Sequence, residues 1–446
     1  MHIIIIGNGI AGSSAARHIR KNSDHVITMF SDETDYPFSR TALMYLYMGH
    51  MKFDHIKLYE DWFWAKNRIK IIKDRVNSID TTNKIISLNK GDNISYDKLI
   101  IATGSKSNKF GWPGQDLEGV QGLYHLQDLE SMEIASEKGI TRAVIVGGGL
   151  IGIEMAEMFH SRHIPVTFLV REDSFWNIIL PKEESEMVNR HIVAHGIVLK
   201  LGEELAEIKG QDGKVKSVIC KSSGEEISCE FVGLTVGVSP NIDILRSSGI
   251  STNRGIIVDE YLRTSEDDIY AVGDCVELSD PKPGRLKIEA VWYTGRMMGE
   301  TVAKTICGDQ TAYDPGIWFN SAKFFDIEYQ VYGDIPAIIP EHITSLYWQH
   351  ATENKAIRIN FDTATESVTG FNLMGIRYRH AVCEKWIKER TKIETVLEHL
   401  SLANFDPEFF EAYEGAFIAM YNQKSGKSLK LKARRKLVMV KQFLIG

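Results

Sequence analysis

The sequence predicts an α/β protein in which two parallel-sheet domains precede a third, α+β domain. The first observation is a repeat of strand, glycine-rich turn and helix, since residues 142–152 (RAVIVGGGLIG) match residues 2–12 (HIIIIGNGIAG) without a gap. The second is that each copy is followed by a later apolar strand that ends at glycine, at Gly104 and at Gly237. The third is a change beyond Trp318 to short strands rich in aromatic residues. Strands that alternate with helices indicate parallel sheets, whereas successive short strands followed by helices indicate an α+β domain.

The two glycine-rich turns have the spacing of dinucleotide-binding turns. Each has the form G-x-G-x-x-G directly after an apolar strand. The first glycine permits the tight turn, the second lets the backbone approach a pyrophosphate, and the third lets the helix pack on the strand. The pyrophosphate then lies at the helix N-terminus, against N–H groups without a partner in the helix. The repeat therefore predicts two Rossmann-like dinucleotide sites. Their glycines are Gly7, Gly9 and Gly12 in the first copy and Gly147, Gly149 and Gly152 in the second.

The end of the next strand in each copy indicates how a ribose would be bound. Asp32 and Glu172 both stand 20 residues past the third glycine of their copy, where a carboxylate that accepts hydrogen bonds from ribose is expected. Arg171 precedes Glu172, and Ser31 takes the matching place in the first copy. Arginine favours a 2′-phosphate and glutamate favours a free 2′-hydroxyl, so the choice between NADPH and NADH stays open.

Composition limits the class of protein and its compartment. The chain has 446 residues, 43% hydrophobic and 25% charged, as expected for a globular protein of two or three domains. Its five cysteines form no C-x-x-C or C-x-x-x-x-C pair, which argues against a disulfide scaffold, a local redox dithiol and a metal site. No segment approaches the run of about 18 apolar residues that a membrane span requires. We therefore expect a cytoplasmic protein without a signal peptide.

The net charge of −7 conceals a basic C-terminal tail, because residues 424–446 carry eight basic side chains and no acidic one. Charge complementarity would let this tail dock an acidic partner protein. The tail also contains RRKLVMVKQFLIG, which ends in an apolar run, so peripheral membrane contact is an alternative use. A third alternative is that the tail is solvated or disordered. One basic tail is insufficient to indicate nucleic-acid binding, and we expect none.

Four segments, taken in order, resemble one family of flavoproteins. The segments GNGIAG, YDKLIIATGSK, VIVGGGLIGIEMAE and DIYAVGD are similar to those of the FAD-dependent pyridine nucleotide-disulfide oxidoreductases, which include glutathione reductase, NADH oxidases and ferredoxin reductases. The resemblance implies a discontinuous FAD-binding domain at 1–110 and 241–315 and an inserted NAD(P)H-binding domain at 111–240. It also implies an interface domain at 316–446 with a basic helical extension, so a homodimer is a candidate assembly.

The resemblance also assigns site residues in the first domain. Asp274, which follows Gly273 in DIYAVGD, would hydrogen-bond the ribityl chain of FAD. Thr103 and Gly104 would border the same site at the end of their strand, and Gly237 would do so in the NAD(P)H domain.

The stretch after the first repeat indicates the branch of the family. Disulfide reductases have C-x-x-x-x-C here and NADH oxidases a single cysteine, whereas YPFSRTALMYLY resembles the Y-D-R-P-P-L-S-K stretch of rubredoxin and ferredoxin reductases. Arg40 matches the arginine of that pattern. The paired prolines are replaced by Thr41 and Ala42, and the lysine that pairs with Glu154 is replaced by Tyr45. Glu154 would then have a pKa raised by desolvation, or would find Arg40 or another partner; a purely structural role is also open.

A second segment, KIEAVWYTGRMMGE, corresponds to the helix start that ferredoxin reductases bring to the pyrimidine edge of the flavin. Trp292 and Tyr293 are the candidate residues, and the positive end of their helix would stabilise negative charge on a reduced ring. The alternative for both residues is that they are aromatic residues of the protein core on a buried helix and do not contact the flavin.

The predicted function is transfer of hydride from NADH or NADPH to FAD, and of electrons from FAD to an iron–sulfur protein of the ferredoxin or rubredoxin type. An NAD(P)H oxidase or a quinone reductase is the alternative within the same class. The alternative of another class is an interaction protein that resembles apoptosis-inducing factor and whose interactions depend on the state of its bound nucleotide.

Overall fold

The computed structural model describes residues 1–406, 408–409 and 411–432. They form two compact units. One unit consists of residues 1–175 and 192–316, and the other of residues 176–191 with the described residues from 317 onward. The glycine-rich turns and the predicted site residues all belong to the first unit.

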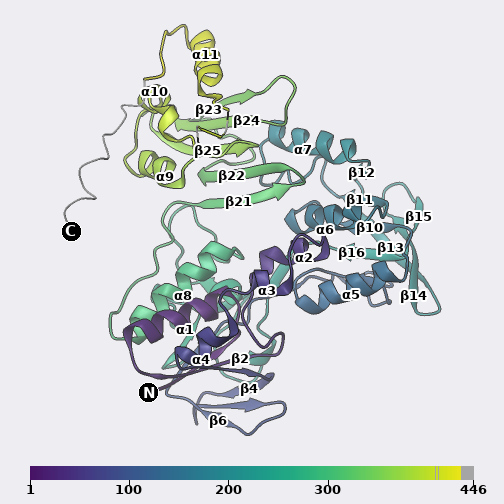
Figure 1. Ribbon diagram of the computed structural model, residues 1–446, viewed down its shortest axis with the longest axis vertical. Helices are drawn as coiled ribbons and strands as arrows, with labels where there is room; N and C mark the ends of the chain where they lie inside the picture. The colour runs from purple at the N-terminus through teal and green to yellow at the C-terminus, as the bar shows by residue number, and fades with distance from the viewer. Residues whose placement is uncertain (407, 410, 433–446) are drawn as a thin grey trace. The chain divides into compact units, whose positions relative to one another are not determined.

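The first unit contains two parallel five-stranded sheets of the same design (Figure 1). The strand order is β19-β7-β1-β2-β3 in one and β12-β11-β10-β16-β9 in the other, and every neighbouring pair is parallel. The repeat at 2–12 and 142–152 thus places β1 and β10 in the centre of their sheets. The strands are β1 (His2–Ile6), β2 (Val26–Ser31), β3 (Ile69–Lys73), β7 (Lys98–Ile101) and β19 (Ile269–Ala271), then β9 (Val120–Gln121), β10 (Ala143–Val146), β11 (Val166–Val170), β12 (Val198–Leu201) and β16 (Phe231–Leu234).

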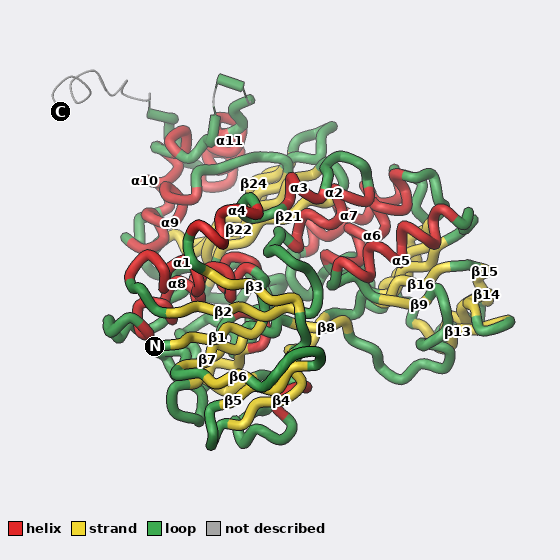
Figure 2. The backbone as a smooth tube through the Cα atoms, turned by 60° about the horizontal axis from the view of Figure 1, so that its bottom comes forward, coloured by secondary structure: helices red, strands yellow, loops and turns green. Residues whose placement is uncertain are grey.

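The apolar runs of the sequence become these central strands because both faces of each sheet are buried. Ile3, Ile4 and Ile5 of β1 are fully buried, as are Val144 and Ile145 of β10. Figure 2 shows β2, β1 and β7 side by side in the first sheet. The main helices of the unit are α1 (Ile10–Asn22), α5 (Leu126–Glu137), α6 (Leu150–Ser161) and α8 (Trp292–Ile306).

An antiparallel ribbon joins the two sheets at the carboxyl ends of their strands. β8 (Ser105–Ser107), just after β7, pairs with β17 (Val238–Pro240), just after β16. The Thr103 hydroxyl donates to the Asn241 carbonyl at 2.6 Å beside this ribbon. The ribbon therefore brings together the two strand ends at which the sequence placed nucleotide-binding glycines.

Short elements complete the first unit. Two further small sheets are antiparallel, with orders β4-β5-β6 and β13-β14-β15, and β18 pairs with β20 in parallel. The strands are β4 (Val76–Asp80), β5 (Ile85–Leu88), β6 (Ile94–Ser95), β13 (Leu205–Gln211), β14 (Lys214–Cys220), β15 (Glu226–Ser228), β18 (Ile256–Val258) and β20 (Val276–Leu278), and the short helices are α2 (Leu43–Tyr47), α3 (Phe53–Ile56) and α4 (Asp61–Lys66), with 3₁₀ turns η1 (Arg40–Ala42), η2 (Asp243–Leu245) and η3 (Gly273–Cys275).

Tyr47 holds α2 against two helices of the second sheet. Its hydroxyl shares a hydrogen bond with Ser136 of α5, and its ring meets Phe159 of α6 edge-on. The Arg162 guanidinium lies over the ring at 3.6 Å from the centroid and donates to the Tyr47 carbonyl at 2.6 Å, while Glu133 pairs with the same guanidinium. These contacts fix α2 relative to the second sheet.

The second unit is built on an antiparallel sheet of order β21-β22-β25-β24-β23, and its short strands lie in the aromatic-rich segment beyond Trp318. Arg358 of β24 is buried and pairs with Glu184, which is also buried, and with Glu183, so these ions fasten α7 to the sheet. The elements are β21 (Phe319–Phe324), β22 (Ile327–Gly333), β23 (Ile343–Gln349), β24 (Ala356–Asp362), β25 (Val368–Met374), α7 (Lys182–Ala194), α9 (His380–Lys388), α10 (Ile393–Glu398), η4 (Leu400–Leu402) and α11 (Glu414–Ser425).

The described part of the basic tail lies against α10. Lys427 pairs with Glu394, and the Lys432 ammonium lies 2.6 Å from Glu398. Residues 427–432 have neither helix nor strand, and the rest of the tail, 433–446, lies outside the described residues. Within the described residues, no helix is both long and apolar enough to cross a membrane.

Glycines allow α1 and α8 to pack in close contact. A Cβ added at Gly299 would lie 2.4 Å from the Ala11 carbonyl oxygen and 2.9 Å from the Ser14 Cβ. A Cβ at Gly295, one turn earlier on α8, would meet nothing closer than 3.5 Å. The two helices therefore depend on Gly299 for their separation, and far less on Gly295.

We predict that Gly299→Ala lowers the free energy of unfolding by about 1–3 kcal/mol, because the helices must move apart. Gly295→Ala is the matched control on the same helix and should stay within about 1 kcal/mol of the wild type, since alanine is the better helix former. Guanidinium unfolding of both variants without added cofactor measures this. Equal effects of the two substitutions would show that the contact with α1 is not limiting.

Candidate functional site

The first glycine-rich turn is closed on two sides and open on the third. A Cβ added at Gly7 would lie 2.1 Å from the Ala102 carbonyl oxygen, and one at Gly12 would lie 2.1 Å from the Gly7 carbonyl oxygen. A Cβ at Gly9 would have nothing within 4 Å. Gly9 is the N-cap of α1, so the free space lies beside the N–H groups that begin this helix. This is the geometry that a bound pyrophosphate requires.

The second turn has the same geometry. A Cβ at Gly147 would lie 2.6 Å from the Thr235 carbonyl oxygen, and one at Gly152 would lie 2.3 Å from the Gly147 carbonyl oxygen. Gly149, the N-cap of α6, has nothing within 4 Å. The two turns therefore match in structure as well as in sequence, and both have free space beside their middle glycine.

A cavity of about 380 Å³ opens on the first turn and extends between the two sheets of the first unit. Leu150, Ile151 and Glu154 of α6 border it on one side, and Leu43 and Met44 of α2 on another. The predicted site residues that line it are Gly7, Gly9, Asp32, Arg40, Thr103, Gly104, Glu154, Gly273, Asp274 and Trp292.

The other predicted residues lie outside the cavity wall. Gly12 closes the first turn from behind, and Tyr293 packs edge-on against Trp292. Gly237 follows β16, with φ +86°. The remaining residues belong to the second turn and the strand end beside it, and they are Gly147, Gly149, Gly152, Arg171 and Glu172.

Asp274 fits the predicted contact with a polyhydroxyl chain. It follows β19 at the cavity wall, where burial raises the pKa of its carboxyl. The Tyr124 hydroxyl donates to it at 3.1 Å, and no other hydrogen bond to this carboxylate is formed within the described part of the chain. A carboxylate with spare acceptor capacity at the wall of a cavity suits hydroxyl donors such as those of a ribityl chain.

Trp292 adds a donor without an acceptor. It begins α8 and lines the cavity. Its indole Nε1 is buried and has no hydrogen-bond partner among the described residues. A buried N–H beside a cavity favours a ligand that carries an acceptor at that position.

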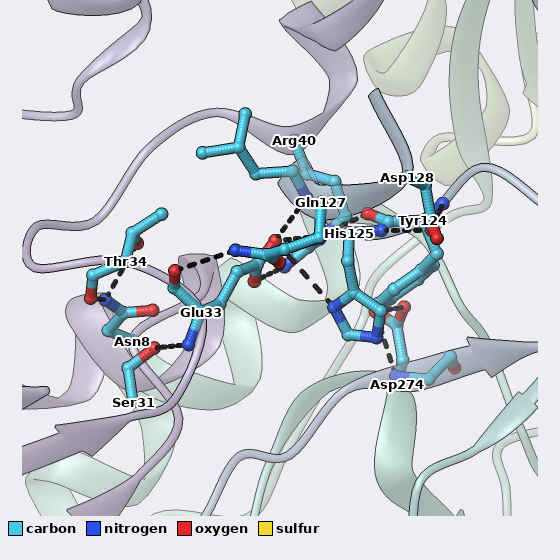
Figure 3. A network of polar contacts seen from close by, with 12 residues as sticks. Asn8, Ser31, Glu33, Thr34, Arg40, Tyr124, His125, Gln127, Asp128 and Asp274 are labelled. Carbon is cyan, nitrogen blue, oxygen red and sulfur yellow. Dashed lines mark hydrogen bonds and ion pairs between the residues drawn. The ribbon is translucent and has the colours of Figure 1, made fainter. Parts of the chain in front are cut away.

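Arg40 is paired with Glu33, a residue that the sequence did not single out. The guanidinium donates to both Glu33 carboxylate oxygens, at 2.9 and 2.6 Å. Glu33 is buried, which opposes ionisation, but hydrogen bonds from His125 and Arg40 lower its pKa to about 2. Glu33 also accepts the Leu126 N–H at 2.8 Å. Figure 3 shows that these side chains form one polar network, which reaches Asp274 through Tyr124.

Asp32 precedes Glu33 and is exposed at the cavity edge. It forms no hydrogen bond with another described residue, so its carboxylate is available to a ribose. The two adjacent acidic residues at this strand end therefore differ in environment, since Glu33 is buried and hydrogen-bonded whereas Asp32 is exposed.

Glu154 faces the cavity without a cationic partner. Burial raises the pKa of its carboxyl to about 7, with a further contribution from the charge of Glu157. No described residue donates a hydrogen bond to it, and Arg40 is engaged by Glu33. Tyr45, at the position of the family lysine, lies on α2 and stacks with His50. Of the outcomes considered for Glu154, the structure favours the raised pKa over a pairing with Arg40.

The cavity contains no cysteine among its described wall residues. Cys275, next to Asp274, is fully buried, and burial raises its pKa to about 11. Its thiol would donate to the carbonyls of Ile101 and Val272. Because the thiolate is the reactive form, this residue is unsuited to a redox relay.

Arg171 and Glu172 form an ion pair with each other at the end of β11. The Arg171 guanidinium lies 2.7 Å from the Glu172 carboxylate. The side chain of Arg171 is 71% exposed and that of Glu172 is 23% exposed. Glu172 is thus held near the second turn, while Arg171 extends into solvent.

Comparison with known proteins decides the family. The sequence profile of one family, described as pyridine nucleotide-disulphide oxidoreductase, matches residues 1–299. The chain belongs to this family. Its predicted family, its α/β fold class and its activity as an FAD-dependent NAD(P)H oxidoreductase are thereby confirmed.

Relatives in this family include electron-transfer enzymes and an oxidase. The chain is 32% identical over 317 residues to an NADH-rubredoxin oxidoreductase of Clostridium acetobutylicum, covering 70% of this chain and 76% of that protein. It is 30% identical over 338 residues to an NADH oxidase of Methanocaldococcus jannaschii, covering 74% and 75%. The crystal structure of NADH:rubredoxin oxidoreductase from Clostridium acetobutylicum is 25% identical and superposes with a TM-score of 0.69, over 89% of this chain and 98% of that one.

Several residues of the cavity were missed from sequence. Glu33 was hidden because its neighbour Asp32 has the expected spacing, and Tyr124 and His125 lie in no recognisable motif. The hydrogen bonds join Glu33 to residues more than 90 positions away, which no local pattern reveals. The available signal for Glu33 was that two acidic residues stand side by side at 32–33, the second of them seven residues before Arg40.

We predict that Glu154 makes stability depend on pH. Its pKa is raised from 4.5 to about 7, so the folded protein keeps a proton that the unfolded chain has released between these values. Stability contributed by this proton therefore falls as pH rises through this window. The Glu154→Gln variant should become progressively more stable than the wild type from pH 5 to 8. Urea unfolding across this range measures the difference, and a difference that stays constant with pH would contradict the assignment.

Proposed function

We propose that this enzyme passes electrons from NADH, through FAD in the cavity of the first unit, to an iron–sulfur protein of the rubredoxin or ferredoxin type. The observation that carries the proposal is a cavity that extends from the first glycine-rich turn to α6 of the second sheet and has no cysteine among its described wall residues. The relatives named as rubredoxin reductases support the choice of acceptor.

We assign FAD to the domain formed by 1–110 and 241–315, and the pyridine nucleotide to 111–240. When bound, FAD supplies a ring that accepts hydride and can release its electrons singly. Gly7, Gly9 and the start of α1 bind its pyrophosphate, and Asp32 accepts from its ribose. Asp274 accepts from the ribityl hydroxyls, and Trp292 donates at the ring edge.

Glu154 and the N-terminus of α8 act on charge near the ring. A carboxyl with a pKa of about 7 holds or releases a proton near neutral pH, so it adds no fixed negative charge beside a site that receives electrons. The partial positive charge at the start of α8 stabilises negative charge in the cavity.

Glu172 favours NADH as the donor. Its carboxylate is held at the strand end beside the second turn, where it can accept from a free 2′-hydroxyl. Arg171 is already paired with it, so a 2′-phosphate would have to compete with Glu172 for the guanidinium and would be repelled by the carboxylate.

The test is anaerobic reduction of the purified holoenzyme by NADH, followed by rapid mixing with oxidised rubredoxin, with oxidised ferredoxin, or with air. The proposal predicts that one of the iron–sulfur proteins reoxidises the flavin at least about tenfold faster than air does. Faster reoxidation by air would make this enzyme an oxidase, as the relative from Methanocaldococcus jannaschii is named.

We predict that Glu172→Ala changes the choice of nucleotide. Loss of the ribose acceptor should lower kcat/KM for NADH about tenfold or more, whereas kcat/KM for NADPH should rise because Arg171 is released. Glu226→Ala, which removes an exposed carboxylate of β15, is the control and should alter neither. Equal changes for NADH and NADPH in Glu172→Ala would contradict the role of Glu172.

A further inference from the structure

Tyr124 connects the cavity of the first unit to the second sheet. Its hydroxyl accepts the Ser105 N–H at 2.9 Å and donates to Asp274 at 3.1 Å. Its ring lies 4.4 Å from the Arg40 guanidinium, and Arg40 also donates to its carbonyl. Figure 3 shows Tyr124 between Arg40 and Asp274. Every one of these groups except Ser105 lines the cavity.

The segment that follows Tyr124 is fixed by the same network. Glu33 accepts the Leu126 N–H, and its carbonyl accepts from the Gln127 side chain at 3.1 Å. Asp128 accepts the N–H groups of Tyr124 and His125, both at 2.8 Å. The first turn of α5 is therefore held by Glu33, at the strand end next to Asp32.

The segment that precedes Tyr124 leads directly to the second glycine-rich turn. β9 (Val120–Gln121) is hydrogen-bonded to β16, which leads into Thr235. The Thr235 hydroxyl donates to the Val146 carbonyl at 2.8 Å and lies 3.2 Å from the Gly147 carbonyl oxygen. A continuous set of contacts thus runs from Asp274 through Tyr124, β9 and Thr235 to Gly147.

We propose that Tyr124 is a positioning residue through which FAD and the pyridine nucleotide strengthen each other's binding. Asp274 and Arg40 both line the cavity and both contact Tyr124, so a ligand bound there can touch the two groups that hold Tyr124. A ligand that engages both further restricts the motion of Tyr124 and, through it, of β9 and α5 beside the second turn, so less ordering remains for the second ligand to impose. The inference rests on the assignment of FAD to this cavity.

The test is a comparison of NAD⁺ affinity with and without FAD, using the full chain from which FAD has been removed and to which it is then restored. We expect FAD to tighten NAD⁺ binding about fivefold or more in the wild type, in the usual range of coupling between sites. The ratio of NAD⁺ affinities with and without FAD measures this coupling. In Tyr124→Phe, which keeps the ring but loses both hydroxyl hydrogen bonds, this ratio should fall close to one. FAD binding itself should weaken about tenfold.

Tyr96→Phe is the matched control. The Tyr96 hydroxyl is buried in the same unit and has no hydrogen-bond partner among the described residues. This variant should keep the wild-type ratio, because it removes an equal group outside the network. Glu33→Gln is a second variant, which should lower the ratio from the α5 side. A wild-type ratio in Tyr124→Phe and Glu33→Gln, or a ratio of one in the wild type, would overturn the proposal.

Amide hydrogen exchange separates failure of this proposal from failure of the cavity assignment. Adding FAD to the wild type should slow exchange both at residues 7–14 and at residues 121–137. In Tyr124→Phe, FAD should protect residues 7–14 only. If residues 7–14 gain no protection in the wild type, FAD is not bound in this cavity. If they do and residues 121–137 do not, the site stands and the coupling through Tyr124 is wrong.

Discussion

The close approach of strand, turn and helix at each glycine-rich turn is the constraint on which the rest of this structure depends. At Gly7 and Gly12 a single added carbon would overlap a backbone carbonyl at 2.1 Å. Because the chain is so tight there, α1 starts directly beside β1 and its N–H groups point into the space left free at Gly9. The second turn repeats this arrangement, and the ribbon of β8 and β17 brings the two carboxyl edges together. Both sites thus arise from one local design.

Charge around the cavity is held in two different ways. Arg40 is kept, but it is bound to Glu33, and the lysine expected opposite Glu154 is Tyr45. Without a cation nearby, burial leaves Glu154 with a pKa of about 7. The cavity therefore combines a permanently ionised pair, Glu33 with Arg40, and a carboxyl that changes charge near neutral pH. Such a group can gain or lose a proton when the charge in the cavity changes during a redox reaction, which a fixed ion pair cannot do.

Much of the fold could be predicted because it is encoded locally. The two G-x-G-x-x-G turns, the apolar strands before them and the helix that begins at Trp292 are visible in short windows of sequence, and the structure contains each of them. Contacts between distant segments could not be predicted. Glu33 meets Leu126, Asp274 meets Tyr124, and residues 176–191 belong with the sheet that starts at Phe319. These pairings depend on the packing of segments that lie far apart in the chain, and the periodicity of the sequence does not indicate them.

The central claim, that the first turn binds FAD and the second binds the pyridine nucleotide, is tested most directly by one pair of variants, Gly9→Glu and Gly149→Glu. Neither glycine has a left-handed backbone, with φ of −64° and −113°, and neither would crowd a Cβ, so both variants should fold. The measurement is the flavin content of each purified protein and its reduction by NADH and by dithionite. Gly9→Glu should be purified without FAD, whereas Gly149→Glu should retain FAD that dithionite reduces and NADH does not. Full FAD content in Gly9→Glu, or wild-type reduction of Gly149→Glu by NADH, would contradict the assignment of the two turns.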